Sequence, residues 1–179
     1  TKTIVEIGCA DGRNTQNLIH YCESAGGTLH AIDPDPRLNE ADWMSTHAQH
    51  LRFYREPSLH ALPKIDDVYD AVIIDGDHNW YTVYHELLLI EQHANATGLF
   101  PMILFHDVGW PYGRRDMYSD PDRIPASHRR PFAKKGMLPS AKELQAWGGL
   151  NAHAWNATEE FSARNSVLTA IEDFLMQSS

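Results

Sequence analysis

Residues 5–12 read VEIGCADG, an apolar strand that breaks into an acidic turn with a glycine at each end. Residues 28–33 read TLHAID, a second apolar run that ends in a carboxylate. In nucleotide-binding α/β folds, a strand leads through a glycine turn into a helix. An acid about 20 residues further on then binds the ribose of the adenosine. The pattern therefore predicts a cofactor that contains adenosine, with Asp33 as the ribose ligand.

The charge of this turn indicates which cofactor binds. Glu6 and Asp11 add carboxylates to a loop turned by Gly8 and Gly12, and the middle glycine of a dinucleotide loop is missing. Carboxylates repel a pyrophosphate and attract a sulfonium or an ammonium group. We therefore expect a cofactor with a sulfonium or ammonium group. Residues 6–12, EIGCADG, with Asp33 after the second strand resemble the cofactor motif of class I S-adenosylmethionine-dependent methyltransferases. The resemblance implies that Glu6, Gly8, Asp11, Gly12 and Asp33 bind S-adenosylmethionine. An NAD-dependent oxidoreductase remains the alternative enzyme.

Strands and helices alternate along the first two thirds of the chain. The expected strands cover 3–7, 28–33, 51–55, 71–75 and 102–105, and the expected helices cover 14–21, 36–44, 80–93 and 166–176. This alternation predicts a doubly wound α/β fold with a mainly parallel, Rossmann-like sheet in a single domain, 1–179. Glu56 and Ser58 follow the third strand, where such sheets bind ligands, and we expect them near the adenosine.

Residues 109–164 differ from the rest of the chain. They are rich in proline, glycine and aromatic residues, and they carry nine Lys and Arg against six Asp and Glu, a net charge of +3 against −12 for the remainder. Long segments without a periodic pattern are often lids or binding loops, and the aromatic content favours order. We expect a lid or acceptor-binding segment. Its candidate acceptor contacts are Trp110, Tyr112 and Trp147 for stacking on sugars, and Arg114 and Arg115 for an anionic group.

Acids and histidines follow two neighbouring strands. Asp75 and His78 come after the fourth strand, and His106 and Asp107 come after the fifth. Parallel strands end at one edge of a sheet, so these residues should meet beside the cofactor. Asp75, His106 and Asp107 are predicted to hold Mg²⁺ or Mn²⁺, and His78 is predicted to act as a general base toward a hydroxyl group.

These motifs resemble those of class I S-adenosylmethionine-dependent methyltransferases. IDGDH at 74–78 and FHD at 105–107 are similar to the family that contains macrolide sugar O-methyltransferases, cephalosporin hydroxylase-like proteins and mycobacterial methylmannose enzymes. The resemblance implies that Asp75, with the positions of His106 and Asp107, holds Mg²⁺ and that His78 is the base. A carboxylate is usual where this chain has His106. The fold of that family also implies a further helix before the first strand and a final strand pair, so we expect a trimmed version of a longer protein.

Composition narrows the list of partners. A net charge of −9 argues against nucleic acid, and no apolar run is long enough to span a bilayer. We expect a cytoplasmic enzyme that acts on a small saccharide or glycoside acceptor, with a homo-oligomer as a further expectation. A non-catalytic binding module, in which the acids and histidines only cap strands, remains the alternative outside enzymes.

Overall fold

The computed structural model describes residues 2–139 and 141–177 and divides the chain into two compact units. Unit 1 comprises residues 1–76 and 88–106, and unit 2 comprises residues 77–87 and 107–179. Helix α4 (Trp80–Thr97) begins in unit 2 and ends in unit 1. Each unit has its own sheet structure and its own buried interior.

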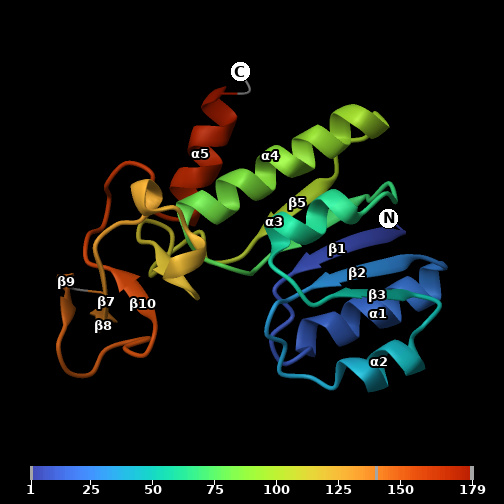
Figure 1. Cartoon of the computed structure of the whole chain (residues 1–179), viewed down its shortest axis with the longest axis horizontal. Coiled ribbons are helices and arrows are strands. Elements are labelled where there is room, and N and C mark those ends of the chain that lie inside the picture. The colour runs from blue at the N-terminus through green and yellow to red at the C-terminus, as the bar shows by residue number, and fades with distance from the viewer. Residues whose placement is uncertain (1, 140, 178–179) are drawn as a thin grey trace. The chain divides into compact units, whose positions relative to one another are not determined.

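A five-stranded parallel sheet forms the centre of unit 1, in the order β3-β2-β1-β4-β5 (Figure 1). The strands are β1 (Thr3–Ile7), β2 (Thr28–Ile32), β3 (Leu51–Tyr54), β4 (Ala71–Ile74) and β5 (Met102–Phe105). Ile7 is in register with Ile32 and Ile74, and Ile74 is in register with Phe105. The strands therefore end at one edge, and the predicted doubly wound fold is confirmed.

Helices cover both faces of this sheet (Figure 1). Helices α1 (Arg13–Ala25) and α2 (Glu40–Thr46) lie on one face, whereas α3 (Ser58–Ala61) and the end of α4 lie on the other. Successive strand residues point to opposite faces, so the apolar strands contribute to two buried clusters. Within residues 2–139 and 141–177, no helix combines the length and apolar character needed to cross a bilayer.

Several helix boundaries differ from the prediction, and α4 continues beyond residue 93 to Thr97. The helix expected over 36–44 is α2, which begins only after Asn39. The Asn39 side chain accepts a hydrogen bond from the Asp42 amide at 3.3 Å, so this residue, and not the prolines before it, sets the start of the helix. Helix α1 continues beyond residue 21 to Ala25 and stops at Gly26, whose φ of 65° is left-handed.

Unit 2 contains short strands that the sequence did not predict. Strands β6 (Met117–Tyr118), β10 (Trp155–Ala157) and β7 (Phe132–Lys134) form an antiparallel sheet, and β8 (Gly136–Leu138) pairs with β9 (Ala141–Gln145). Strands β6, β7, β8 and β10 have only two or three residues, too few for an alternation to be recognised from a pattern. Helix α5 (Val167–Gln177) completes the unit.

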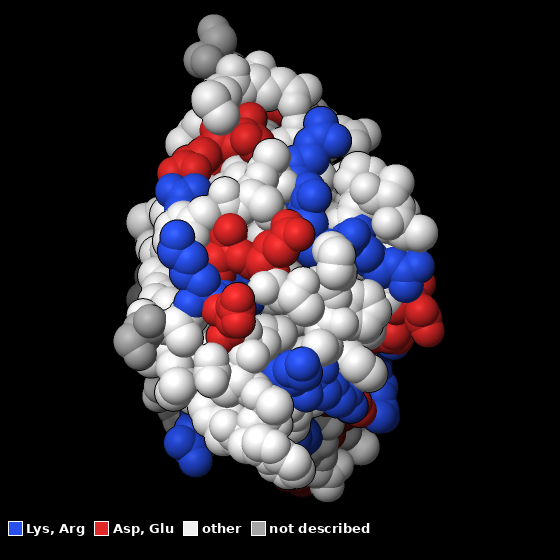
Figure 2. Space-filling view, turned by 90° about the vertical axis from the view of Figure 1, so that its left-hand side faces the viewer, with Lys and Arg blue, Asp and Glu red and all other residues white. Residues whose placement is uncertain are grey.

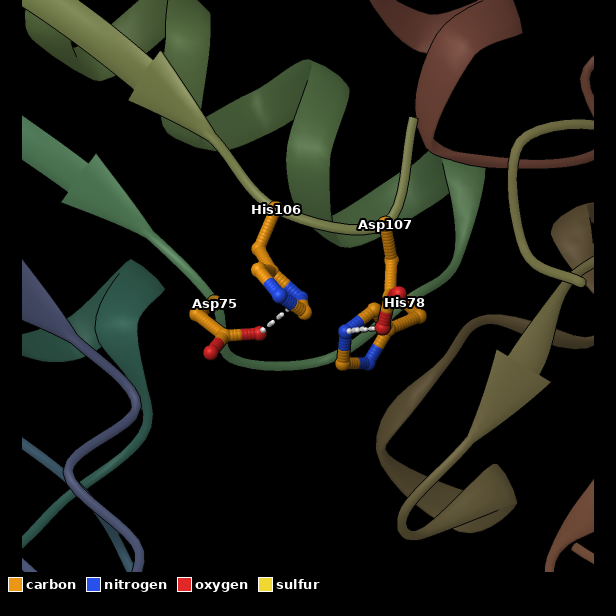
Figure 3. Close-up of side chains that lie close together, drawn as sticks. All are labelled: Asp75, His78, His106 and Asp107. Atoms are coloured by element: carbon orange, nitrogen blue, oxygen red, sulfur yellow. Dashed lines mark ion pairs between the residues drawn. The ribbon is translucent and has the colours of Figure 1, made fainter. Parts of the chain in front are cut away.

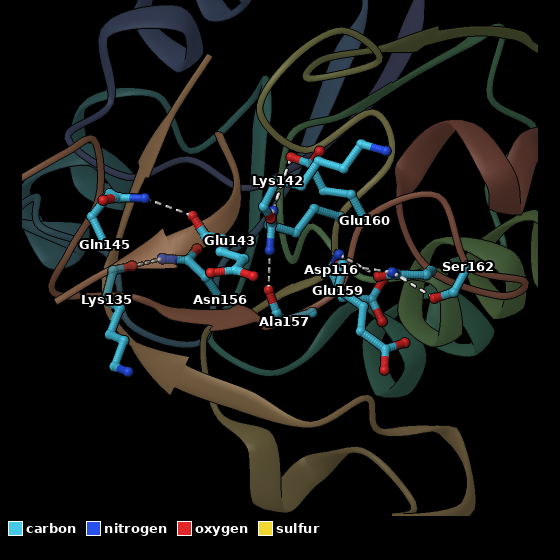
Figure 4. A network of polar contacts seen from close by, with 12 residues as sticks. Asp116, Lys135, Lys142, Glu143, Gln145, Asn156, Ala157, Glu159, Glu160 and Ser162 are labelled. Atoms are coloured by element: carbon cyan, nitrogen blue, oxygen red, sulfur yellow. Dashed lines mark hydrogen bonds and ion pairs between the residues drawn. The ribbon is translucent and has the colours of Figure 1, made fainter. Parts of the chain in front are cut away.

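Polar side chains fill much of the interior of unit 2. Arg115, which is 1 % exposed, donates to the carbonyl oxygens of Ala157 and Lys142 and pairs with Glu160. Asn156 donates to the Lys135 carbonyl oxygen at 2.9 Å, as Figure 4 shows. These side chains donate hydrogen bonds to backbone carbonyl oxygens that have no partner in the short strands.

The surface charges of the chain are mixed. Figure 2 shows basic and acidic side chains interspersed on the face that it presents. The basic excess of residues 109–164 is therefore not gathered into one continuous basic surface on that face.

Candidate functional site

The loop after β1 needs glycine for two different reasons. Gly8 has a φ of 90°, and a Cβ there would lie 2.1 Å from the carbonyl oxygen of Asp75. Gly12 has a φ of 80° and stands directly before α1. Only glycine combines the close approach at Gly8 with the left-handed conformation. The loop therefore turns sharply from the edge of the sheet into the helix.

Asp33 holds this loop in place. Its Oδ2 accepts hydrogen bonds from the backbone amides of Cys9, at 2.9 Å, and Ala10, at 2.8 Å. Its Oδ1 accepts from the Asp35 amide at 2.8 Å. The structure thus brings the predicted ribose ligand to the glycine loop and gives it a second role that the spacing did not reveal. Contact with a ribose stays a prediction.

Glu6 is a buried carboxylate beneath the same loop. It is 1 % exposed, and its Oε1 accepts a hydrogen bond from the Asn14 side chain at 2.8 Å. Its Oε2 is buried and has no hydrogen-bond partner among the described residues. Burial raises the pKa of Glu6, and the nearby carboxylate of Asp75 adds to this effect. An orphaned buried acceptor of this kind fits a donor group such as an ammonium. Asn14 was missed because an amide at the start of a helix has no distinctive pattern.

The other predicted cofactor residues differ in their exposure. Asp11 is exposed and pairs with Arg13 at 3.1 Å. Glu56 follows β3 and accepts a hydrogen bond from Lys64 at 2.7 Å. Ser58 is the buried first residue of α3. Glu56 and Ser58 follow β3, as the sequence indicates. Their contact with a cofactor remains a prediction.

Each unit carries one acid–histidine pair of the predicted cluster. In unit 1, Asp75 Oδ1 lies 3.1 Å from His106 Nδ1, and both side chains are exposed. In unit 2, His78 Nε2 lies 2.8 Å from Asp107 Oδ2, with only 12 % and 26 % of the side chains exposed (Figure 3). His106 and Asp107 are consecutive, and two residues separate Asp75 from His78. Covalent continuity therefore keeps the two pairs close together.

The surroundings of His78 hold it firmly within unit 2. Its ring centroid lies 5.2 Å from that of Tyr112, and its carbonyl oxygen accepts the Met117 amide at 2.9 Å. The Tyr112 hydroxyl accepts a hydrogen bond from Asn151 at 2.7 Å. Burial raises the pKa of Tyr112 and keeps the phenol neutral. These contacts fix the position of the imidazole, and its role as a general base stays a prediction.

Asp77 has a structural role beside this pair. Its Oδ1 accepts the Ser119 amide at 3.0 Å, and its Oδ2 accepts the Asn79 side chain at 2.6 Å. Burial raises the pKa of Asp77. Asp77 therefore anchors the segment that carries His78, and neither carboxylate oxygen lacks a donor.

The predicted acceptor residues fall into two groups. Trp110 and Trp147 are exposed, the latter to 92 %, whereas Tyr112 is buried against His78. Arg114 forms a bidentate pair with Glu172, with N–O distances of 2.5 and 2.6 Å, and Arg115 is buried. Contacts within unit 2 thus account for both guanidinium groups. Exposed aromatic surface remains only at Trp110 and Trp147 among these five residues.

Comparison with known families gives one match. Residues 5–108 match the family model described as a methyltransferase domain. The matched region covers more than half of the chain and includes the glycine loop, Asp33 and both acid–histidine pairs. A search of curated proteins finds no match.

Proposed function

The chain belongs to this methyltransferase family, and from that premise we propose that it methylates a hydroxyl of a sugar or glycosylated natural product. The methyl donor of the family is S-adenosylmethionine. The acceptor class, a divalent cation and a histidine base are parts of the proposal. The single observation that carries it is the His78–Asp107 pair at 2.8 Å at the end of β5.

The cofactor would be held by residues of unit 1. Asp33 keeps the loop of Gly8 in shape, and the buried Oε2 of Glu6 offers an acceptor to a donor group of the ligand. When bound, S-adenosylmethionine supplies a methyl group on a positively charged sulfur. The net negative charge of Glu6 and Asp33 favours that cation over a pyrophosphate.

A divalent cation would be held by Asp75, His106 and Asp107. Together with His78 they form a group of two carboxylates and two imidazoles suited to a metal ion. Carboxylates suit Mg²⁺, and the imidazole of His106 favours Mn²⁺ or a later metal. When bound, the cation would make an acceptor hydroxyl more acidic.

His78 is proposed to accept the hydroxyl proton. Its Nε2 lies 2.8 Å from Asp107 Oδ2, so the carboxylate is placed to pair with the ring once the ring carries the proton. Asp107 then stabilises the imidazolium that forms after proton transfer. Trp110 and Trp147 provide exposed rings for an acceptor sugar, and residues 109–164 are proposed as its lid.

The decisive experiment separates cofactor binding from methyl transfer. Binding of S-adenosylhomocysteine and of NAD is measured by calorimetry, and transfer of labelled methyl groups is measured on glycoside and phenol acceptors, with Mg²⁺, Mn²⁺ or chelator. We expect S-adenosylhomocysteine to bind and NAD not to bind. We also expect chelator to abolish methylation of a glycoside. Methylation that persists in chelator would remove the metal from the proposal, and methylation confined to phenols would remove the sugar.

His78→Asn tests the proposed base. We expect a loss in turnover of about 100-fold or more with unchanged binding of S-adenosylhomocysteine, because His78 belongs to unit 2 and the glycine loop belongs to unit 1. His153→Asn, in unit 2 but outside the pairs described above, is the matched control. Unchanged turnover of the His78 variant would instead support the non-catalytic binding module.

A further inference from the structure

A pocket of about 620 Å³ lies within unit 2. His128, Ala163 and Arg164 of its lining belong to the segment 109–164 proposed above as a lid, but no lining residue was assigned individually to cofactor, metal or acceptor. Its lining residues are Trp80, Tyr84, His85, His128, Ala163, Arg164, Asp173, Met176 and Gln177. They come from the start of α4, from α5 and from the loops around residues 128 and 164. Its volume lies in the range of small-molecule sites, about 300–1,000 Å³.

Aromatic rings form one wall of this pocket. Trp80 stacks on Tyr84, with ring centroids 4.6 Å apart and planes 12° apart. The ring of His128 is parallel to that of Trp80 within 2°, at 5.9 Å. The indole N–H of Trp80 donates to Asp173 at 2.7 Å, which fixes the orientation of the central ring. Trp80 itself is only 4 % exposed, so the half-buried rings of Tyr84 and His128 supply the accessible surface of this wall for a planar group.

Arg164 supplies an available positive charge beside these rings. Its guanidinium carbon lies 5.2 Å from the Trp80 ring centroid, and its side chain is exposed. Within residues 2–139 and 141–177, no carboxylate forms an ion pair with it, whereas Arg114, Arg115 and Arg123 of the same unit are all paired. The cation is held over the aromatic wall without a counter-ion.

One carboxylate and one guanidinium line the pocket. Asp173 accepts the indole N–H of Trp80 through Oδ2 and keeps its negative charge, and Arg164 is the cation. Arg130 adds a second positive charge nearby, because its guanidinium donates to the carbonyl oxygens of Ala163 and Arg164. Two guanidinium groups against one carboxylate favour an anion over a cation.

We propose that this pocket binds a planar aromatic ring that carries a carboxylate or phosphate group. The ring lies along the wall of Trp80, Tyr84 and His128, and the anion pairs with Arg164. Charge-assisted hydrogen bonds from arginine to an anion are about twice as strong as neutral ones, and the ring adds stacking surface. This site is separate from the proposed methyl transfer and requires neither cofactor nor metal.

Calorimetric titration of the whole protein, without S-adenosylmethionine, tests the two parts of the ligand. The probes are benzoate and phenyl phosphate, compared with cyclohexanecarboxylate, benzamide and inorganic phosphate. We expect saturable binding of benzoate or phenyl phosphate, and binding of the other three at least about tenfold weaker. Equal binding of cyclohexanecarboxylate would refute the aromatic part, and equal binding of benzamide would refute the anionic part. Absence of saturable binding to both aromatic anions would refute the site.

Variants identify the pocket as the place of binding. Arg164→Gln changes an exposed side chain and should weaken binding of the aromatic anions about tenfold. His128→Gln removes one ring of the wall and should weaken it severalfold. Arg123→Gln, an exposed arginine paired with Asp120, is the matched control and should bind as the parent does. Unchanged binding by the Arg164 variant, or an equal loss in the Arg123 control, would overturn the assignment.

Discussion

The two units of this chain differ in the polar content of their interiors. Both bury apolar side chains, and unit 2 also buries a network of hydrogen-bonded polar residues. Unit 1 buries apolar side chains such as Val5, Leu29 and Val72 on both faces of a regular parallel sheet. Unit 2 buries Arg115, Asp116 and Asn156 among short strands and loops. Backbone groups in unit 1 find partners in the sheet ladder, whereas many in unit 2 find them in side chains.

This difference predicts different responses to mutation. Apolar packing is non-directional, so its energy changes gradually with the volume removed. A buried polar side chain has specific partners, and its loss leaves each of them desolvated and unpaired. Substitutions in unit 2 should therefore be costly wherever they remove a partner from the polar network, and least costly at exposed side chains.

The largest expected effect is that of Arg115→Met. This change leaves the Glu160 carboxylate and the carbonyl oxygens of Ala157 and Lys142 without their donor. We expect the free energy of unfolding to fall by about 3–5 kcal/mol, measured by chemical denaturation. Arg114→Met is the control, because its pair with Glu172 is partly exposed and should contribute about 1 kcal/mol or less. Similar losses for the two variants would contradict the contrast between polar interior and surface.

Asp116 makes the polar interior sensitive to pH. Its carboxylate accepts the amides of Trp80 and Ser166, at 2.7 and 2.6 Å, yet burial raises its pKa from the ordinary 3.8 to about 6. The folded state thus binds this proton more tightly than the unfolded chain. The contribution of Asp116 to stability is greatest below about pH 4 and falls by about 3 kcal/mol as the pH rises to about 6.

Asp116→Asn measures this contribution by difference. We expect the variant to lack the fall between pH 4 and pH 6, so that its free energy of unfolding relative to the parent improves with pH across this range. Subtracting the variant from the parent removes the effects of the other titrating groups, including the histidines. A difference that is the same at both ends of the range would show that Asp116 does not titrate there.

Substitutions in the apolar interior of unit 1 should lower the free energy of unfolding in proportion to the side-chain volume they remove. Ile74 is 3 % exposed in the apolar cluster beside α4. We expect Ile74→Val to lower the free energy of unfolding by about 1 kcal/mol and Ile74→Ala by about 2–5 kcal/mol, in proportion to the volume removed. The measurement is again chemical denaturation. Equal losses from the two substitutions would argue against non-directional packing in this unit.

The smallest effect on stability is expected at Trp147. This side chain is 92 % exposed, so Trp147→Ser should change the free energy of unfolding by less than about 0.5 kcal/mol. Under the proposed function it should raise KM for the acceptor and leave kcat unchanged, because the ring would bind ground state and transition state alike. Steady-state methylation kinetics with increasing acceptor provide the check. Unchanged KM would remove Trp147 from the acceptor site.

Prediction from the sequence succeeded where the physical signal is local and repeated. The five apolar strands of unit 1 were found because buried parallel strands are continuous apolar runs. Helix α2 was placed too early because the cap formed by Asn39 outweighs the pattern before it. The short strands of unit 2 were missed because two or three residues carry no period.

For the candidate site, the residue types were predictable and their partners were not. Asp75, His78, His106 and Asp107 were chosen from their places after strands, and the pairs Asp75–His106 and His78–Asp107 became visible only in the structure. Arg115 was expected at an acceptor, yet its partners lie 27 to 45 residues away in the chain. The position of a residue in the sequence does not show which distant residues will become its hydrogen-bond partners.

The sequence by itself determined the parallel sheet, the glycine loop and the acids at the strand ends, because strand periodicity and turn chemistry are properties of neighbouring residues. Only the tertiary structure decided that Asp33 holds the loop, that Arg115 is an interior residue and that Arg164 remains available beside a wall of rings. The physical reason is that burial and hydrogen-bond partners depend on segments far apart in the chain, which meet only when it folds.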